Sequence, residues 1–359
     1  MRGPCHDERR SRHRSTASGL NSAAGTSLTL PSPPGPGGRG RKKGEAARRP
    51  IRSNAAPNTP DARLADAPVA PIPWSDRIEA WGAALFFAAM GALPIDAASG
   101  LGGALARHIG PRLGISKRAR RNLAAALPEL SAGEVERVLR GMWDNLGRVA
   151  AEYPHLPRIR VFPSDGRVET SGIEHLDRAI AGGRPVIIFG GHLGNWEIAA
   201  RAAGQYGIDV AQIYRAANNP LVDRMIARFR GTGSEFIPKG AIASRRALAA
   251  LRRGGHLTLL VDQKLNDGIA VPFFGRPAMT APALASLALR FDCEVLPARV
   301  ERLKGAYFRL TVFPPLPLAR SGDHHADVAT LMTRVNETLE AWVRDRPEQW
   351  FWLHRRWPD

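Results

Sequence analysis

The sequence predicts an α/β fold in which a mixed sheet is flanked by helices on both faces. Two observations support this prediction. From about residue 161 onward, short β-rich runs alternate with helical stretches, as is typical of an α/β sheet covered on both sides. The chain has 359 residues, of which 44% are hydrophobic, and this is enough for a full core.

The expected strands are short apolar runs, and the expected helices lie mostly between them. The strands are expected over residues 186–189, 210–214, 256–261, 295–300 and 307–313. The helices are expected over residues 221–229, 245–253, 281–291 and 328–343, with another beginning near Trp196. Upstream, residues 116–152 look helical, and Ser131 with Glu134 forms a capping box that opens the second helix of this stretch.

The first 70 residues are basic and rich in Pro, Gly and Ser. They hold thirteen Lys or Arg against five Asp or Glu and show no apolar periodicity. Such a segment is predicted to be a disordered tail, because it cannot bury enough surface to order itself. Weak attraction to an anionic membrane is the functional alternative. No apolar stretch follows close to the N-terminus, so a signal peptide is not expected.

The first strongly apolar stretch runs over residues 80–93. It is shorter than the roughly 20 residues that a bilayer span requires, and Pro94 and Asp96 interrupt it. Its pattern fits a buried core helix or a membrane anchor that is tilted or lies in the interface, with Trp74 and Arg77 at the headgroups. The expected organisation is a tail over 1–70, a membrane-anchor or interfacial helical region over 71–115 and an α/β domain over 116–359.

The formal net charge of +18 indicates an anionic partner. A nucleic acid is disfavoured, because no zinc-finger spacing, aromatic RNA-binding signature or heptad-bearing basic helix is present. The two cysteines, Cys5 and Cys293, are too few for a disulfide framework and suggest no metal site. The sequence predicts no metal and no cofactor.

The segment that indicates chemistry is 190–197, where His192 follows an apolar strand and Glu197 opens a helix. This placement puts an imidazole at the carboxyl edge of a sheet, where α/β folds bind their ligands. A carboxylate bonded to one ring nitrogen fixes the tautomer and raises the basicity of the other nitrogen. We therefore expect Glu197 to orient His192 as a general base; a structural turn with a hydrogen-bonded histidine is the alternative.

Three further clusters follow strands and are expected to converge on His192. Each alone is also compatible with surface charge, a helix cap or core aromatics. Together they predict a pocket with one base, cations and apolar walls. The expected substrate-binding residues are Arg215, Asn218 and Asn219; Asp262, Gln263 and Lys264; and the aromatic turn of Phe273, Phe274 and Gly275.

The ordered motifs resemble a known family. His192 and Glu197 match the H-x4-[D/E] pair of the glycerolipid acyltransferases, and the remainder resembles their bacterial lipid A late (lauroyl/myristoyl) acyltransferase branch. The resemblance covers residues 74–358, and the basic extension before it departs from the pattern. The other matching pieces lie at 121–123, 127–129, 145–148 with Glu152, 214–215, 219–220, 262–263, 273–275 and 347–357.

This resemblance implies a glycerolipid acyltransferase-like fold with an N-terminal membrane helix. It also implies an acyl carrier protein as donor, a phosphorylated glycolipid as acceptor, and a location at the inner membrane with the catalytic domain facing the cytoplasm. Both substrates are acidic, so electrostatic attraction to them would explain the net positive charge of the chain. The expected reaction is direct attack of the acceptor hydroxyl on the thioester, since Cys293 has no adjacent base to make it a nucleophile.

The roles of the other residues follow from this reaction. Arg215 is expected to stabilise the oxyanion or bind a phosphate, because a guanidinium suits both. Asp262 is expected to organise the pocket around Arg215 or Lys264. The alternatives are acylation of another glycolipid such as a phosphatidylinositol mannoside, a non-catalytic glycolipid-binding protein, and a nucleic-acid-binding protein.

Overall fold

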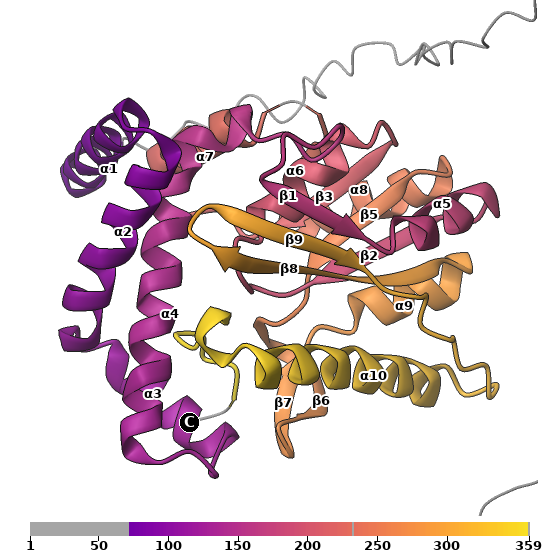
Figure 1. Cartoon of the computed structure of the whole chain (residues 1–359). Helices are drawn as coiled ribbons and strands as arrows, with labels where there is room; N and C mark the ends of the chain where they lie inside the picture. The colour runs from indigo at the N-terminus through magenta and orange to yellow at the C-terminus, as the bar shows by residue number, and fades with distance from the viewer. Residues whose placement is uncertain (1–71, 232, 358–359) are drawn as a thin grey trace, which may run out of the picture. The chain divides into compact units, whose positions relative to one another are not determined.

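The computed structural model describes residues 72–231 and 233–357 (Figure 1). The predicted tail over residues 1–70 lies outside this part of the chain. The described chain begins with helices that precede the sheet. They are α1 (Trp74–Ala92), α2 (Ile95–Ile109), η2 (Gly110–Arg112), α3 (Ser116–Ala126), α4 (Ala132–Glu152) and η3 (Tyr153–Arg158).

Helix α2 packs along α4 at very short range. A Cβ atom on Gly102 would lie 2.5 Å from the carbonyl oxygen of Gly147, so both helices need glycine at this crossing. Helix α2 is attached to α4 through the close backbone approach at Gly102 and Gly147.

The predicted capping box opens α4: the Ser131 side chain accepts from the Glu134 N–H, and the Glu134 carboxylate accepts from the Ser131 N–H.

The main sheet has seven strands in the order β1-β9-β8-β2-β5-β3-β4. Five neighbouring strands, β8, β2, β5, β3 and β4, are parallel, whereas β9 is antiparallel to β8 and β1 is parallel to β9. The predicted mixed sheet is therefore confirmed. The strands are β1 (Val168–Ser171), β2 (Val186–Gly190), β3 (Val210–Tyr214), β4 (Glu235–Pro238), β5 (His256–Leu260), β8 (Glu294–Lys304) and β9 (Tyr307–Val312).

Helices cover both faces of this sheet, as predicted. Every residue of β2 is buried, because Val186 and Ile188 pack on one face and Ile187 and Phe189 on the other. One face contacts α5 (Ile173–Ala181) and α6 (Glu197–Gln205). The other contacts α8 (Ala241–Arg252), α9 (Ala283–Phe291) and α10 (His324–Asp345), and α7 (Pro220–Arg230) lies between β3 and β4 in the chain.

Sequence reasoning missed a second sheet, the hairpin of β6 (Lys264–Phe273) and β7 (Arg276–Thr280). Its turn contains Phe274 and Gly275, which have φ angles of 53° and 65°. Phe273 and Phe274 pack against Trp350, Trp352 and Trp357, which follow the short helix η4 (Pro347–Gln349). The aromatic C-terminus is thus part of the core.

Within the described residues, none of the helices is long and apolar enough to cross a membrane. Helix α1 nevertheless carries an exposed apolar face formed by Trp74, Ile78, Trp81 and Leu85, of which Trp74 is 76% and Trp81 80% exposed. Residues spaced by three or four lie on one side of a helix. The sequence expectation is an anchor that is tilted or lies in the interface, and within the described residues this apolar face of α1 is exposed.

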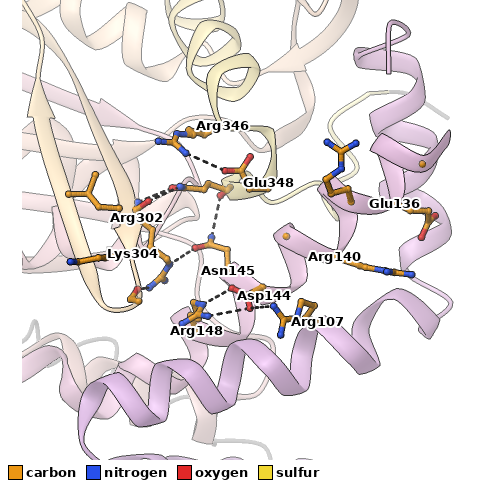
Figure 2. A pocket seen from close by; sticks show the side chains of 16 residues that line it. Arg107, Glu136, Arg140, Asp144, Asn145, Arg148, Arg302, Lys304, Arg346 and Glu348 are labelled. Carbon is orange, nitrogen blue, oxygen red and sulfur yellow. Dashed lines mark hydrogen bonds and ion pairs between the residues drawn. The ribbon is translucent and has the colours of Figure 1, made fainter. Parts of the chain in front are cut away.

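The β8–β9 turn lies opposite α4 across an arginine-rich hollow (Figure 2). Helix α2 and η4 complete its walls. The hollow is at the end of β8 that coincides with the carboxyl edge of the parallel strands.

Candidate active site

Four polar side chains follow four neighbouring parallel strands and therefore share one edge of the sheet. His192 follows β2, Asp262 follows β5, Arg215 follows β3 and Lys239 follows β4. Sequence reasoning identified the first three. It missed Lys239, because strand β4 was not recognised before it. Once β4 is assigned, Lys239 is predicted to lie at the site, because the carboxyl ends of parallel strands meet at one edge of a sheet.

His192 is held by Asp262, because β5 is the direct neighbour of β2 in the sheet. The Nδ1 atom of His192 lies 2.7 Å from one carboxylate oxygen of Asp262, and the His192 backbone N–H donates to the other at 2.7 Å. Trp350 donates from its indole N–H to that second oxygen at 2.8 Å. The carboxylate is completely buried and fixes both the ring and the backbone of His192.

The ionisation of Asp262 follows from these contacts. Burial by itself would raise the pKa of the Asp262 carboxyl, but attraction to His192 and the hydrogen bonds from its ring and backbone hold that pKa well below its usual range. With Nδ1 carrying the proton that the carboxylate accepts, Nε2 of His192 is left as a lone-pair acceptor. Such an imidazole can accept a proton at Nε2.

The turn that presents His192 requires glycine at Gly194. Its φ is 54°, and a Cβ atom there would lie 2.6 Å from the carbonyl oxygen of Val300. Asn145 donates to the Gly194 carbonyl at 2.9 Å, and the Gly194 N–H donates to the Gln349 carbonyl at 3.1 Å. The turn is therefore fixed by α4, by β8 and by the C-terminal segment together.

Glu197 does not bond to His192, which corrects the role expected from the sequence. Its carboxylate accepts from Tyr153 at 2.8 Å and from two nitrogens of Arg230 at 2.7 and 2.8 Å. Glu197 is the first residue of α6, and its side chain is directed toward η3 and α7 instead of toward the imidazole. Burial would raise the pKa of Glu197, but the hydrogen bonds and charge of Arg230 lower it below its ordinary value.

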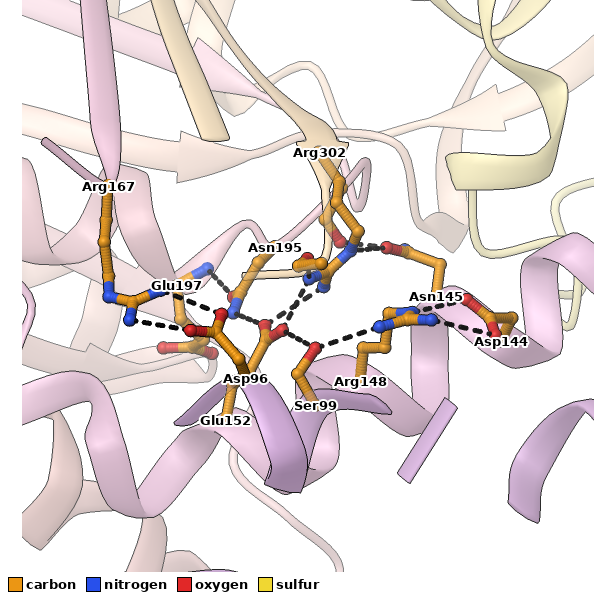
Figure 3. A network of polar contacts seen from close by, with 12 residues as sticks. Asp96, Ser99, Asp144, Asn145, Arg148, Glu152, Arg167, Asn195, Glu197 and Arg302 are labelled. Carbon is orange, nitrogen blue, oxygen red and sulfur yellow. Dashed lines mark hydrogen bonds and ion pairs between the residues drawn. The ribbon is translucent and has the colours of Figure 1, made fainter. Parts of the chain in front are cut away.

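A second buried carboxylate, Glu152, joins the turn to three other elements (Figure 3). It accepts from Ser99 of α2 at 2.7 Å, from Asn195 of the turn at 2.7 Å and from the guanidinium of Arg302 on β8 at 3.0 Å. Asn195 also accepts from the Glu197 N–H at 3.1 Å. This network ties the turn that presents His192 to the N-terminal helices.

Two exposed cations, Arg215 and Lys239, lie beyond Asp262 along the sheet edge. Arg215 donates to Asn218 at 3.3 Å, and Lys239 reaches Gln263, the neighbour of Asp262, at 3.4 Å. The four residues that follow the parallel strands are therefore gathered at one sheet edge. This gathering was expected from the sequence for three of them and not for Lys239. The expectation that Asp262 organises Arg215 or Lys264 is wrong, because its oxygens bond to His192 and Trp350.

Several predicted binding residues have structural roles instead. Asn219 caps α7 by accepting from the Leu221 N–H at 2.9 Å, and its amide donates to the Asp76 carbonyl and the Glu79 carboxylate of α1. Its hydrogen-bonding groups are thus already used. The side chains that were expected to line an acyl pocket, Phe273 and Phe274, are buried against tryptophans, and Gly275 forms the hairpin turn. Lys264, the first residue of β6, is half-buried, and its binding role stays a prediction.

A narrow cavity of about 70 Å³ lies beside His192, between α6, β3 and β5. Its lining is mostly apolar but includes the Glu197–Arg230 pair, and the guanidinium of Arg230 also stacks over Tyr214 and Phe236 at 4.9 and 5.5 Å. Glu197 therefore belongs to the wall of the cavity that His192 lines. Its part in the site is to shape this wall.

His354 is a further member of the site that sequence reasoning did not single out. Its ring centroid lies 5.0 Å from that of His192, and burial lowers the pKa of His354 to about 3, so it is neutral near pH 7. Nitrogen or oxygen atoms of His192, Asp262 and His354 lie within 4.8 Å of one another, a set that can hold a metal ion. The direct hydrogen bond between His192 and Asp262 already accounts for their closeness.

A family profile for bacterial lipid A biosynthesis acyltransferases matches residues 74–359 of the chain. Phosphatidylinositol mannoside acyltransferase of Mycobacterium tuberculosis is 27% identical over 263 residues, which cover 70% of this chain and 78% of that protein. Lipid A biosynthesis myristoyltransferase of Escherichia coli is 27% identical over 281 residues, which cover 76% and 85%.

The solved structure of a 1-acyl-sn-glycerophosphate acyltransferase from Thermotoga maritima aligns with 74% of this chain and 98% of that chain, at a TM-score of 0.30 and 13% identity.

Proposed function

The chain belongs to the bacterial lipid A biosynthesis acyltransferase family, and we propose that it transfers a fatty acyl chain from acyl-acyl carrier protein to a hydroxyl of a lipid A precursor. The family predicted from the sequence motifs is confirmed, and with it the assignment of the chain as an acyltransferase. The donor, the acceptor and the catalytic base are the parts that we propose. The observation that carries the catalytic base is the hydrogen bond between His192 Nδ1 and Asp262. The donor and the acceptor rest on the family to which the chain belongs.

In the proposed reaction, Nε2 of His192 removes the proton from the acceptor hydroxyl. The hydroxyl oxygen attacks the thioester carbonyl carbon, and the carbonyl electrons move onto oxygen to form a tetrahedral intermediate. This intermediate collapses with cleavage of the carbon–sulfur bond, and the departing thiolate takes the proton from His192. Asp262 stabilises the imidazolium that exists between the two proton transfers, as the carboxylate does in a serine hydrolase triad.

The cations at the sheet edge support an anionic acceptor. Arg215 and Lys239 are both exposed and follow adjacent strands, with Asp262 between them and His192 in the order of the sheet. A phosphate group bound by these two side chains would place a neighbouring hydroxyl near the base. Arg215 has the planar fork that suits a phosphate, whereas Lys239 adds a point charge.

The exposed apolar face of α1 supports a location at the inner membrane. Its tryptophans, Trp74 and Trp81, are the residue type enriched at the membrane–water interface, and Arg77 stacks over Trp74 at 5.0 Å. We place α1 in the interface, parallel to the membrane, with the catalytic domain on the cytoplasmic side. This is the interfacial form of the anchor expected from the sequence, and it would bring a lipid-embedded acceptor to the enzyme.

A second acceptor is supported by one comparison. The phosphatidylinositol mannoside acyltransferase of M. tuberculosis is as similar to this chain as the E. coli myristoyltransferase, since both are 27% identical. Purified enzyme should therefore be assayed with acyl-acyl carrier protein or acyl-coenzyme A as donor, and with a lipid A precursor or a phosphatidylinositol mannoside as acceptor. Transfer to neither acceptor would contradict the proposal, and transfer to the mannoside alone would favour the second one.

A further inference from the structure

A second cavity in the described part of the chain lies apart from the narrow cavity beside His192 and is larger than it (Figure 2). It encloses about 780 Å³, a volume in the range of small-molecule sites. Six arginines and one lysine line it, against two glutamates and one aspartate. We call this cavity the arginine hollow. Its charge makes it unlike an ordinary solvated groove, in which the two signs are interspersed.

Two of its arginines already have close partners. Arg148 forms an ion pair with Asp144, and Arg302 forms one with the buried Glu152. Their positive charges are therefore largely compensated by these partners. Asp144 is also the carboxylate that Arg107 approaches, at 3.8 Å, so one carboxylate is shared by two of the arginines.

Five cations around the rim are weakly compensated. Arg107, Arg137 and Arg346 approach carboxylates only at 3.8, 3.7 and 3.9 Å. Arg140 and Lys304 make no ion pair with any residue that the structure describes, although both line the hollow. Gathering such charges around one cavity is unfavourable unless an anion is bound there.

We propose that the arginine hollow binds a phosphate-bearing ligand, either the phosphate of a lipid headgroup or that of a soluble compound. Guanidinium groups bind phosphate oxygens through paired N–H donors, which is why arginine predominates at such sites. The hollow presents these groups from three directions: α4 contributes Arg140, α2 contributes Arg107 and the β8–β9 turn contributes Lys304. A phosphate group, with its oxygens arranged around one centre, matches donors that converge in this way.

The hollow is only one layer of residues away from the catalytic turn. Asn145 and Gln349 line it, and the same two residues bond to the backbone of Gly194, two positions after His192. Because β8 is parallel to β2 and adjacent to it, the hollow and Arg215 lie on opposite sides of His192 along the sheet edge. An acceptor with two anionic groups would therefore be held on both sides of the base.

The test is a direct binding measurement, which does not depend on the proposed acyl transfer. The full chain carrying Arg140→Glu with Lys304→Glu is compared with the wild type and with a control carrying Arg252→Glu with Arg253→Glu. The control makes the same charge change at exposed positions near the end of α8. The probes are inorganic pyrophosphate, measured by calorimetry at low salt, and vesicles of phosphatidylcholine with or without phosphatidylglycerol, measured by flotation.

We expect the hollow variant, but not the control, to lose about tenfold or more in affinity for at least one probe. A loss for pyrophosphate alone identifies a soluble phosphate ligand, and a loss confined to phosphatidylglycerol vesicles identifies a lipid headgroup. Equal affinities of wild type, hollow variant and control for both probes would overturn the inference. The milder pair Arg140→Gln with Lys304→Gln, checked by circular dichroism, gives the same comparison if the glutamate variant does not fold.

Discussion

Asp262 bonds to His192 at two points, through the ring Nδ1 and through the backbone N–H, each at 2.7 Å. The carboxylate therefore fixes the tautomer of the imidazole and the position of its backbone at once. An amide at position 262 would have to present its NH₂ group to one of these two donors. This relationship leads to the first prediction.

Asp262→Asn is expected to lower kcat by about 10²–10⁴-fold, because the imidazole loses its orienting carboxylate and the stabilisation of its charged form. His192→Ala should lower kcat to a similar level, and the double variant should be no slower than the worse single one. The measurement is steady-state acyl transfer by folded, purified protein. Asp267→Asn, a change at an exposed position of β6, is the control. An Asp262→Asn enzyme with near wild-type kcat would rule out the proposed dyad.

Glu197→Gln is expected to act mainly on stability. Arg230 would keep its charge in a buried position without its partner, which typically costs about 3–5 kcal/mol of the free energy of unfolding. Because the pKa of Glu197 is lowered in the folded protein, its stabilising contribution is present above the ordinary glutamate pKa of about 4.3 and is lost as the pH falls through the lower folded value.

Denaturant unfolding of wild type and Glu197→Gln between pH 7 and pH 3 checks this prediction. The difference in unfolding free energy should be largest at neutral pH and should shrink below about pH 4. If the variant instead keeps its stability and loses as much kcat as Asp262→Asn, Glu197 acts on the imidazole and not on the fold.

Arg215→Ala and Lys239→Ala are each expected to weaken transfer to a phosphorylated acceptor by about tenfold or more, while affecting a dephosphorylated acceptor much less. Arg215→Lys should recover part of the loss, since it keeps the charge but not the planar fork. The comparison is of kcat/KM for both acceptors. Equal losses on the two acceptors would assign these side chains to the oxyanion or to the wall of the site instead of to phosphate.

Replacing Trp74 and Trp81 by glutamate is expected to release the protein from vesicles, because burial of each indole at the interface contributes on the order of 1.5–3 kcal/mol. Both side chains are more than three-quarters exposed, so the fold should tolerate the change. Ala329→Glu, at an exposed position of α10, is the control. Unchanged vesicle flotation of the tryptophan variant would show that another surface contacts the membrane.

The sequence by itself determined much of this protein. The strand ends that carry His192, Arg215 and Asp262, the capping box at Ser131 and the helices on both faces of the sheet follow from local patterns, because hydrophobic periodicity and capping are read within a few neighbouring residues. The family follows from the order of short motifs along the chain. These features depend on residues close together in sequence.

Tertiary structure decided which carboxylate serves His192. Asp262 is 70 residues away from it in the chain, and the two meet only because β5 pairs with β2 in the sheet. Glu197 is five positions from His192, yet it begins α6 and pairs with Arg230, 33 residues further on. Strand order and the direction of a helix's first side chain depend on packing of the whole chain, so no local pattern specifies them.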